Sequence, residues 1–148
     1  MYATPSTLTL QVTEARQLNP LIRLFRLRAE DGSPLPGYSA GAHLRVQVQL
    51  ADGSRDWRHY SLVDLSADAG ATDAPRDYVI AVRREDDGRG GSRFMHERVQ
   101  AGDRVTVEPP KNDFPLRSHA GCSVLVAGGI GITPLASMAA QRVAERAP

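Results

Sequence analysis

Three short stretches carry residue types that together suit a planar, electron-accepting ring with a phosphate tail. The stretch 58–62, Arg-His-Tyr-Ser-Leu, places a cation, an aromatic ring and a hydroxyl within four residues. Two glycine-rich stretches follow it, 88–92 (Gly-Arg-Gly-Gly-Ser) and 128–134 (Gly-Gly-Ile-Gly-Ile-Thr-Pro). Such a ring needs a nearby cation, hydrogen-bond donors and a turn that accepts phosphate, and the three stretches supply these groups.

The first stretch suits a flavin, because a reduced flavin is electron-rich and benefits from a cation and donors near its ring. On an extended strand Arg58 and Tyr60 share one face and Ser61 points to the other. We expect Tyr60 to lie against the ring, Arg58 to reach the phosphate or ring edge, and Ser61 to approach N5. His59 is compatible with ring contact and, more simply, with a structural role. Taken alone, this pattern fits an ordinary barrel strand, with a surface arginine and a half-buried tyrosine, better than it fits a flavin site.

The second stretch indicates an anion site. Gly90 and Gly91 have no Cβ, so backbone N–H groups can close on an oxyanion. Ser92 is expected to be the N-cap of a helix whose N-terminus favours negative charge. A terminal phosphate would need no lysine there. A glycine-rich turn that ends in an N-cap is the equally open structural alternative.

The third stretch follows an apolar run, 122–127, and opens a predicted helix, which is the context of a dinucleotide-binding turn. It lacks the full GxGxxG spacing, and no acidic residue about 20 positions later selects the ribose. A tight strand-to-helix turn is the alternative, and the context favours a nucleotide.

The elements that position these stretches follow from apolar periodicity. Six short strands with one helical interruption predict a mainly β fold, a small closed antiparallel barrel. The predicted strands are 7–14, 21–28, 44–50, 57–63, 78–83 and 103–108, with a hairpin turn at 52–53. The helix is expected to start at Ser92 and stop at Gly102. Arg23, Arg26 and Arg28 break the period of two, which predicts a bulge or exposed edge and a solvated face.

The pattern of apolar residues changes near residue 120. The run 122–127 is continuously apolar, as expected of a parallel strand buried on both faces. A helix should begin at about Pro134, with an apolar face made of Leu135, Met138, Ala139 and Val143. We therefore expect a barrel domain over 1–118 and, over 119–148, the first β-α unit of an α/β nucleotide-binding domain that is begun and not finished.

Composition limits which partners, metal sites and cellular locations are plausible for this chain. With 148 residues and a net charge of +1, the chain has the size of one domain, and its charge gives no support to nucleic acid or membrane partners. Cys122 is the only cysteine, which excludes an internal disulfide, a four-cysteine iron–sulfur cluster and a cysteine-rich zinc site. The four histidines lack metal-ligand spacing, so no metal site is predicted. Neither a signal peptide nor an apolar run of membrane length is visible, which favours a cytoplasmic protein.

Together the motifs resemble the ferredoxin–NADP reductase superfamily, and most of all its phthalate dioxygenase reductase branch, which includes vanillate O-demethylase reductases. The matching segments are 58–62, 78–85, 88–92, 110–116 and 126–134, in that order. The resemblance implies a flavin-binding barrel followed by an NAD-binding domain. In that branch the flavin is FMN, with FAD as the alternative, and a [2Fe–2S] domain passes electrons to an oxygenase.

The resemblance also implies roles for individual residues by position. These are Arg58, Tyr60 and Ser61 at the isoalloxazine and ribityl region; Ala81, Val82 and Arg83 along the ring; Gly90, Gly91 and Ser92 at the phosphate; Thr133 near the flavin from the second domain; and Gly128, Gly129 and Gly131 facing the pyridine nucleotide.

These expectations describe an NAD(P)H-dependent flavin oxidoreductase module that passes electrons through FMN towards an iron–sulfur or oxygenase partner, as a truncated or split oxygenase reductase. One alternative is a non-catalytic flavin-binding or interaction module that needs a partner chain for NAD(P)H oxidation. Another is a six-stranded barrel without a cofactor. Whether this chain is active alone, whether it uses NADH or NADPH, and which oligomer it forms are left open by the sequence.

Overall fold

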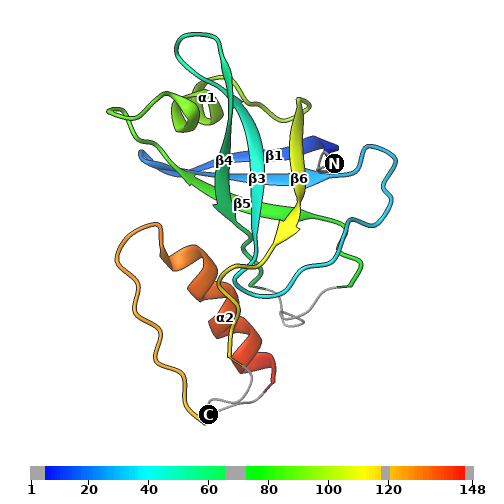
Figure 1. The fold of residues 1–148 in the computed structure, drawn as a ribbon, viewed down its shortest axis with the longest axis vertical. Coiled ribbons are helices and arrows are strands. Elements are labelled where there is room, and N and C mark those ends of the chain that lie inside the picture. Colours follow the sequence, from blue (N-terminus) through cyan, green and yellow to red (C-terminus); the bar gives the residue numbers. More distant parts are fainter. Residues whose placement is uncertain (1–5, 66–72, 118–120, 146–148) are drawn as a thin grey trace, which may run out of the picture.

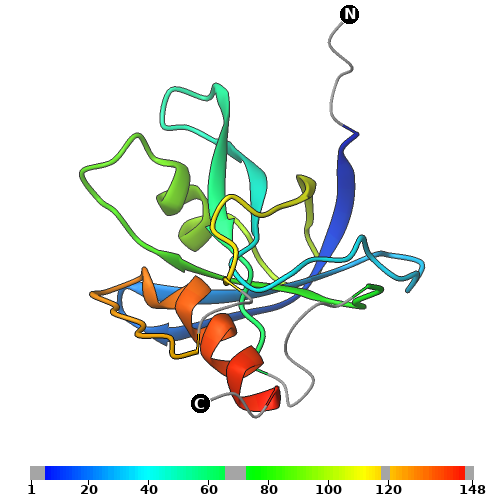
Figure 2. The ribbon, with the colours of Figure 1, turned by 60° about the horizontal axis from the view of Figure 1, so that its bottom comes forward.

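The computed structural model describes residues 6–65, 73–117 and 121–145. In this part of the chain the strands form one antiparallel sheet of six strands in the order β4-β3-β6-β1-β2-β5. The strands are β1 (Leu8–Asn19), β2 (Ile22–Arg28), β3 (His43–Gln49), β4 (Arg55–Ser61), β5 (Tyr78–Arg83) and β6 (Arg104–Lys111); the helices are α1 (Gly91–Glu97) and α2 (Ile132–Ala144). The predicted mainly β fold with a short helix after the fifth strand is confirmed. Figures 1 and 2 show the sheet curling round, with α1 near one end and α2 beyond the other.

The two edge strands meet just after β4. Leu62 forms an isolated antiparallel bridge with Ile80, and the N–H of Val63 donates to the carbonyl of Val79 at 2.9 Å. The predicted barrel is therefore closed by a short contact between β4 and β5 rather than by a full ladder. This contact matters for function, because it brings the stretch 58–62 beside β5.

Alternation of apolar and polar residues places the core inside the curled sheet. On β3 the side chains of Leu44, Val46 and Val48 are buried, as the sequence predicts. Facing strands add Phe25 and Ile80, which are also fully buried. Full burial of a side chain of this size contributes about 1.5–3 kcal/mol. The predicted hairpin also forms, with φ of +83° at Gly53.

The expected bulge or exposed edge on β2 is wrong, and the expected solvated face is wrong at Arg23. β2 lies inside the sheet between β1 and β5, and the register shifts that mark extra residues fall on β1. Arg23 takes an inward position and is 8% exposed. Its guanidinium donates to the carbonyl of His96 at 2.5 Å and to Oε1 of Gln100 at 3.1 Å. Hydrogen bonds to the last turn of α1 allow this charge to lie in the interior.

The predicted start and end of the first helix are also corrected. The N-cap is Gly90, with φ of +98°, and the helix ends at Glu97 rather than near Gly102. Ser92 lies inside the first turn, and its hydroxyl accepts a hydrogen bond from the N–H of Glu85 at 2.9 Å. The serine therefore ties the loop after β5 to α1 instead of capping the helix.

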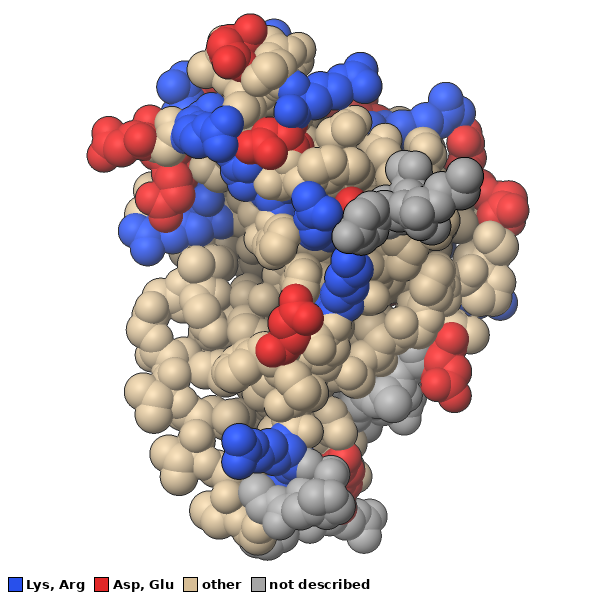
Figure 3. All heavy atoms as spheres, viewed as in Figure 1, with Lys and Arg blue, Asp and Glu red and all other residues tan. Residues whose placement is uncertain are grey.

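The run 122–127 does not form the predicted buried strand. Val124 and Val126 are each 83% exposed, and the segment has no ladder partner among the residues that the structure describes. A parallel strand buried on both faces needs neighbouring strands, and the sheet described above supplies none here. Figures 1 and 2 show the segment running back alongside α2. Over this part of the molecule the surface in Figure 3 is mostly uncharged, while charges of both signs gather over α1 and the β3–β4 hairpin.

Helix α2 forms as predicted, but its buried face differs. Ser137 and Met138 are buried, whereas Ala139 and Val143 are exposed. Met138 packs against Gly41, where φ is +95°. A Cβ at position 41 would stand 2.8 Å from Cε of Met138 and 1.9 Å from the carbonyl oxygen of Phe114, so only glycine fits at this crossing. No helix in the described part of the chain is long and apolar enough to cross a membrane.

Candidate functional site

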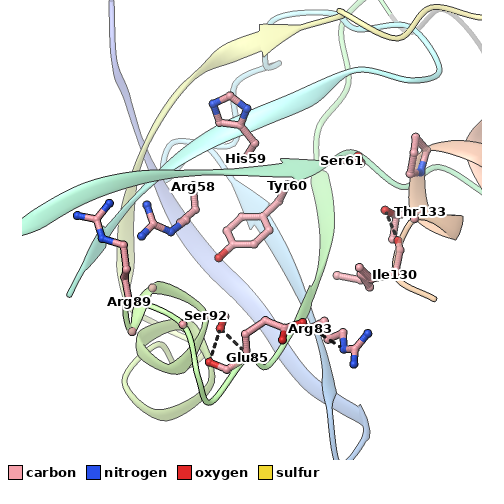
Figure 4. A pocket seen from close by; sticks show the side chains of 16 residues that line it. Arg58, His59, Tyr60, Ser61, Arg83, Glu85, Arg89, Ser92, Ile130 and Thr133 are labelled. Atoms are coloured by element: carbon pink, nitrogen blue, oxygen red, sulfur yellow. Dashed lines mark hydrogen bonds and ion pairs between the residues drawn. The ribbon is translucent and has the colours of Figure 1, made fainter. Parts of the chain in front are cut away.

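A cavity of about 460 Å³ opens where β4 and β5 meet the loop before α1 and the turn before α2 (Figure 4). All three stretches singled out from the sequence contribute to its wall. The lining residues are Arg58, His59, Tyr60, Ser61, Ala81, Arg83, Glu85, Gly88, Arg89, Gly90, Gly91, Ser92, Ile130, Gly131, Thr133 and Pro134. The fold thus brings together segments that are more than 70 positions apart in the sequence.

Arg58 is held in a fixed place at one end of the cavity. Its Nη1 lies 2.6 Å from Oδ2 of Asp56 and 2.8 Å from the carbonyl oxygen of Trp57. Arg89, which is largely exposed, approaches the same carboxylate at 3.3 Å. The hydrogen bond from Arg58 is the main reason why the pKa of Asp56 is lowered, and the charges of the two arginines add to it. Two guanidinium groups against one carboxylate leave this end of the cavity positively charged.

Gly91 provides the space that Arg58 needs. A Cβ at position 91 would stand 2.9 Å from Nε of Arg58 and 3.1 Å from Cγ2 of Val48. Gly90 adopts φ of +98°, and a Cβ there would meet the backbone N of Ala51 at 3.0 Å. The glycine pair is thus required by close packing of the turn as well as by its backbone conformation.

Tyr60 presents an unpaired donor to the cavity. Its ring extends from β4 between Arg58 and the first turn of α1, which carries Ser92 (Figure 4). The hydroxyl oxygen is buried and has no hydrogen-bond partner among the described residues. Burial raises the pKa of Tyr60 to about 12, so the phenol stays protonated and able to donate. Buried hydroxyls of this kind normally have a partner.

Two residues predicted to contact the ligand have side chains elsewhere. His59 points away from the cavity (Figure 4) and stacks on His43, with ring centroids 4.8 Å apart and planes inclined by 16°. Burial and the charge of His59 lower the pKa of His43. The side chain of Val82 is fully buried in the core, so Ala81 and Arg83 line the cavity while Val82 does not. Alternation along the strand explains this difference.

The turn before α2 and the first turn of that helix form the opposite wall. Thr133 lines the cavity as expected, and its hydroxyl donates to the carbonyl of Ile130 at 3.0 Å. Of the three glycines predicted to face a pyridine nucleotide, Gly131 lines the cavity, and Gly128 and Gly129 do not. A Cβ on Gly129 would lie 3.8 Å from Nη1 of Arg83, so this turn passes close to the end of β5.

Sequence reasoning missed several lining residues. These are Glu85, Gly88, Arg89, Ile130 and Pro134. Each lies inside a stretch that the sequence had marked, so proximity along the chain was the available signal. Glu85 adds an ion pair with Arg83 at 3.3 Å, which only the folded loop reveals.

The family model described as oxidoreductase FAD-binding domain matches residues 9–115. This chain belongs to that family. The match covers the sheet, α1 and every cavity residue except those of the turn before α2. The resemblance drawn from the sequence motifs is thereby confirmed at the level of the family.

Known relatives of this FAD-binding domain are larger proteins. The chain is 46% identical over 127 residues to the heme-dependent oxidative N-demethylase beta subunit of Ectopseudomonas mendocina, covering 86% of this chain and 38% of the relative. It is 44% identical over 138 residues to the phthalate dioxygenase reductase of Burkholderia cepacia, covering 93% and 40%. A solved structure of phthalate dioxygenase reductase superposes with a TM-score of 0.82 at 42% identity, covering 95% of this chain and 41% of that one. The chain thus spans about two fifths of the length of these relatives.

Two features of the FAD-binding domain fit a bound flavin. The buried Tyr60 hydroxyl lacks a partner within the described residues, as expected of a group that donates to a ligand. A Cβ at position 91 would collide with Arg58, so glycine at this position keeps the arginine in the cavity wall. The cavity volume also lies in the range of known cofactor sites, roughly 300–1,000 Å³.

Proposed function

We propose that this chain binds FMN in the cavity between β4 and α1 and acts in electron transfer from NAD(P)H towards an iron–sulfur or oxygenase partner. The observation that carries the proposal is the Tyr60 hydroxyl in the wall of that cavity, which has no hydrogen-bond partner among the described residues. Membership of the FAD-binding family supports a flavin. The names of the relatives, a phthalate dioxygenase reductase and the beta subunit of an N-demethylase, support a role as the reductase part of an oxygenase system.

Each part of the cavity has a task in this proposal. Arg58, oriented by Asp56, supplies positive charge for the phosphate or the ring edge. Tyr60 donates its hydroxyl hydrogen to the cofactor. The backbone of Gly90 and Gly91 approaches the phosphate. Because the Ser92 hydroxyl is already bonded to Glu85, Ser92 shapes the loop and offers its backbone N–H rather than its side chain.

The two cavity walls that would flank the flavin ring have separate roles. Ala81 and Arg83 line one side from β5, and Ser61 lies at the end of β4. Thr133 and Gly131 line the opposite side and limit the access of water. A bound flavin supplies the chemistry of accepting a hydride and releasing electrons one at a time. Contacts of Gly128 and Gly129 with the nicotinamide nucleotide stay predictions, as do the domain boundary at 118 and a cytoplasmic location.

The choice of FMN rests on the resemblance to the phthalate dioxygenase reductase branch, while the family description names FAD. Chromatography of the flavin released from purified protein distinguishes them directly. Release of FMN supports the proposal. Release of FAD contradicts the choice of FMN but still supports flavin binding.

The main test is a visible absorption spectrum of the purified protein, recorded before and after NADH is added without oxygen. A flavin band that bleaches supports an oxidoreductase that functions with this chain alone. A band that persists supports the second candidate, a flavin-binding module that needs a partner chain for donor oxidation. Absence of a band after incubation with FMN and FAD contradicts both.

A further inference from the structure

Helix α2 is attached to the barrel through one buried hydroxyl. Ser137 is 1% exposed, although the sequence pattern gives no hint that a serine faces inward at this point of the helix. Its Oγ donates to the carbonyl oxygen of Leu62 at 3.0 Å and accepts from the N–H of Asp64 at 2.9 Å. One side chain therefore satisfies two backbone groups of the segment that leaves β4.

The Ser137 hydroxyl donates its hydrogen bond to the barrel and not to its own helix. A serine in a helix can also donate to the carbonyl four residues earlier, and the oxygen of Thr133 lies 3.5 Å from Oγ. The bond to Leu62 is shorter by 0.5 Å, as the two distances show, and hydrogen bonds weaken as they lengthen beyond about 3.2 Å. Ser137 thus links two elements rather than folding its hydroxyl back onto its own helix.

Ser137 takes the place of a neighbouring strand for residues 62–64. Other partners of this segment come from two other segments: the N–H of Leu62 donates to the carbonyl of Ala42, just before β3, and the N–H of Val63 donates to that of Val79 on β5, both at 2.9 Å. Without Ser137, the buried carbonyl of Leu62 and the N–H of Asp64 would lose this partner. Met138 adds apolar packing against Gly41, which favours contact and imposes little orientation.

The hydroxyl lies between the two walls of the cavity. Leu62 directly follows Ser61, which lines the cavity from β4. Thr133, which lines it from the other side, precedes Ser137 by one helical turn. The distance from the end of β4 to the turn at 130–134 is therefore fixed by the two hydrogen bonds of Ser137.

We propose that Ser137 is a positioning residue that holds α2, and with it the turn 130–134, against the flavin cavity as a shielding wall. This inference rests on the proposed function only for the identity of the ligand. The attachment of α2 itself exists without a cofactor, so it can be measured separately.

The first measurement is amide hydrogen exchange on the flavin-free protein. In the wild type, the N–H of Asp64 should be protected although it lies outside any strand. Ser137→Ala should speed exchange at Asp64 and along α2 by about 10-fold, the loss expected for two hydrogen bonds of ordinary net strength. Ser137→Cys keeps a similar volume with a weak donor and should behave like Ser137→Ala. Ser123→Ala is the matched control, because Ser123 is partly exposed and has no side-chain hydrogen bond among the described contacts.

The second measurement uses flavin-loaded protein. With the wall loosened, both Ser137 variants should release flavin about 10-fold faster and change the shape of its visible absorption band, while Ser123→Ala should match the wild type. Fast exchange at Asp64 in the wild type, or wild-type exchange and flavin release in Ser137→Cys, would overturn the inference. If Ser137→Ala does not fold, the data for the wild type and for Ser137→Cys still decide whether Ser137 positions α2. If the wild type binds no flavin, the proposed function fails, and the exchange data alone decide whether Ser137 holds α2.

Discussion

Arg58 lies across Gly91 so closely that a Cβ at position 91 would stand 2.9 Å from Nε of the arginine. The two residues come from stretches that the sequence marked separately, one for its cation and one for its glycines. Their contact explains both at once: the arginine is held at the cavity by Asp56, and the glycine leaves room for its side chain.

Gly91→Ala should displace the Arg58 side chain, since the clash involves both Arg58 and Val48. Overpacking of this kind costs about 1–3 kcal/mol of folding stability. Because moving Arg58 away from the cavity relieves the clash, flavin affinity should also fall by about 10-fold, the equivalent of about 1.4 kcal/mol. Flavin titration measures this. Gly121→Ala is the control, because a Cβ there meets nothing within 4 Å. Equal affinity for the two variants would show that Arg58 does not help to hold the ligand.

Tyr60→Phe should have opposite effects on stability and on binding. The buried hydroxyl has no partner in the part of the chain that the structure describes, so its removal should leave the flavin-free stability unchanged or raise it by about 1 kcal/mol. Binding loses a donor and should weaken by about 5- to 10-fold. Tyr78→Phe is the contrasting variant, because the Tyr78 hydroxyl already donates to the carbonyl of Pro36 at 2.5 Å. It should lower stability by about 1 kcal/mol and leave flavin affinity unchanged. Chemical denaturation and flavin titration of both variants test the pair, and a destabilised Tyr60→Phe would contradict it.

Arg23→Met should loosen α1 from the barrel. The guanidinium of Arg23, which is itself buried, satisfies the carbonyl of His96 and the side chain of Gln100, and both of these partly buried bonds would be lost. We expect a loss of about 1–3 kcal/mol in unfolding free energy and weaker flavin binding, because α1 begins at the glycine pair. Arg28→Met on the same strand is the control: its two hydrogen bonds to Asp77 are exposed to solvent, so a loss below about 1 kcal/mol is expected. The prediction fails if the two variants are equally stable.

The protein should lose stability between about pH 10 and 12. Burial raises the pKa of Tyr38 and of Tyr60 from 10.0 to about 12, and it raises that of Tyr78 as well. Above pH 10 the unfolded chain releases these protons while the folded chain keeps them, so rising pH favours unfolding. The stability is fully present below pH 10 and declines until the folded tyrosines ionise. Lys111 is the only lysine in the chain, so few other groups titrate in this window. Denaturant titrations across this range, with Tyr60→Phe showing a shallower decline, check the sign.

The local features of the fold could be read from the sequence. The alternation at Leu44, Val46 and Val48 predicts which face of β3 is buried, because side chains on a strand alternate in direction. The Asp52-Gly53 pair predicts the hairpin, since glycine accepts the positive φ that the turn needs. The three ligand-type stretches also predicted most of the residues that line the cavity. In each case the physical cause acts over a few neighbouring residues.

Contacts between distant segments decided the remaining features. Arg23 and Ser137 face inward because they hydrogen-bond to backbone groups of α1 and of residues 62–64. Neither arrangement can be recognised from the residues that surround Arg23 and Ser137 in the sequence. The run 122–127 is apolar enough for a buried strand, yet Val124 and Val126 stay exposed because a strand needs neighbours. Sequence alone determined the strand periods, the turns and the kind of ligand, since these follow from residue type and spacing. Tertiary structure decided which side chains meet, because hydrogen bonding and burial depend on segments that lie far apart in the chain.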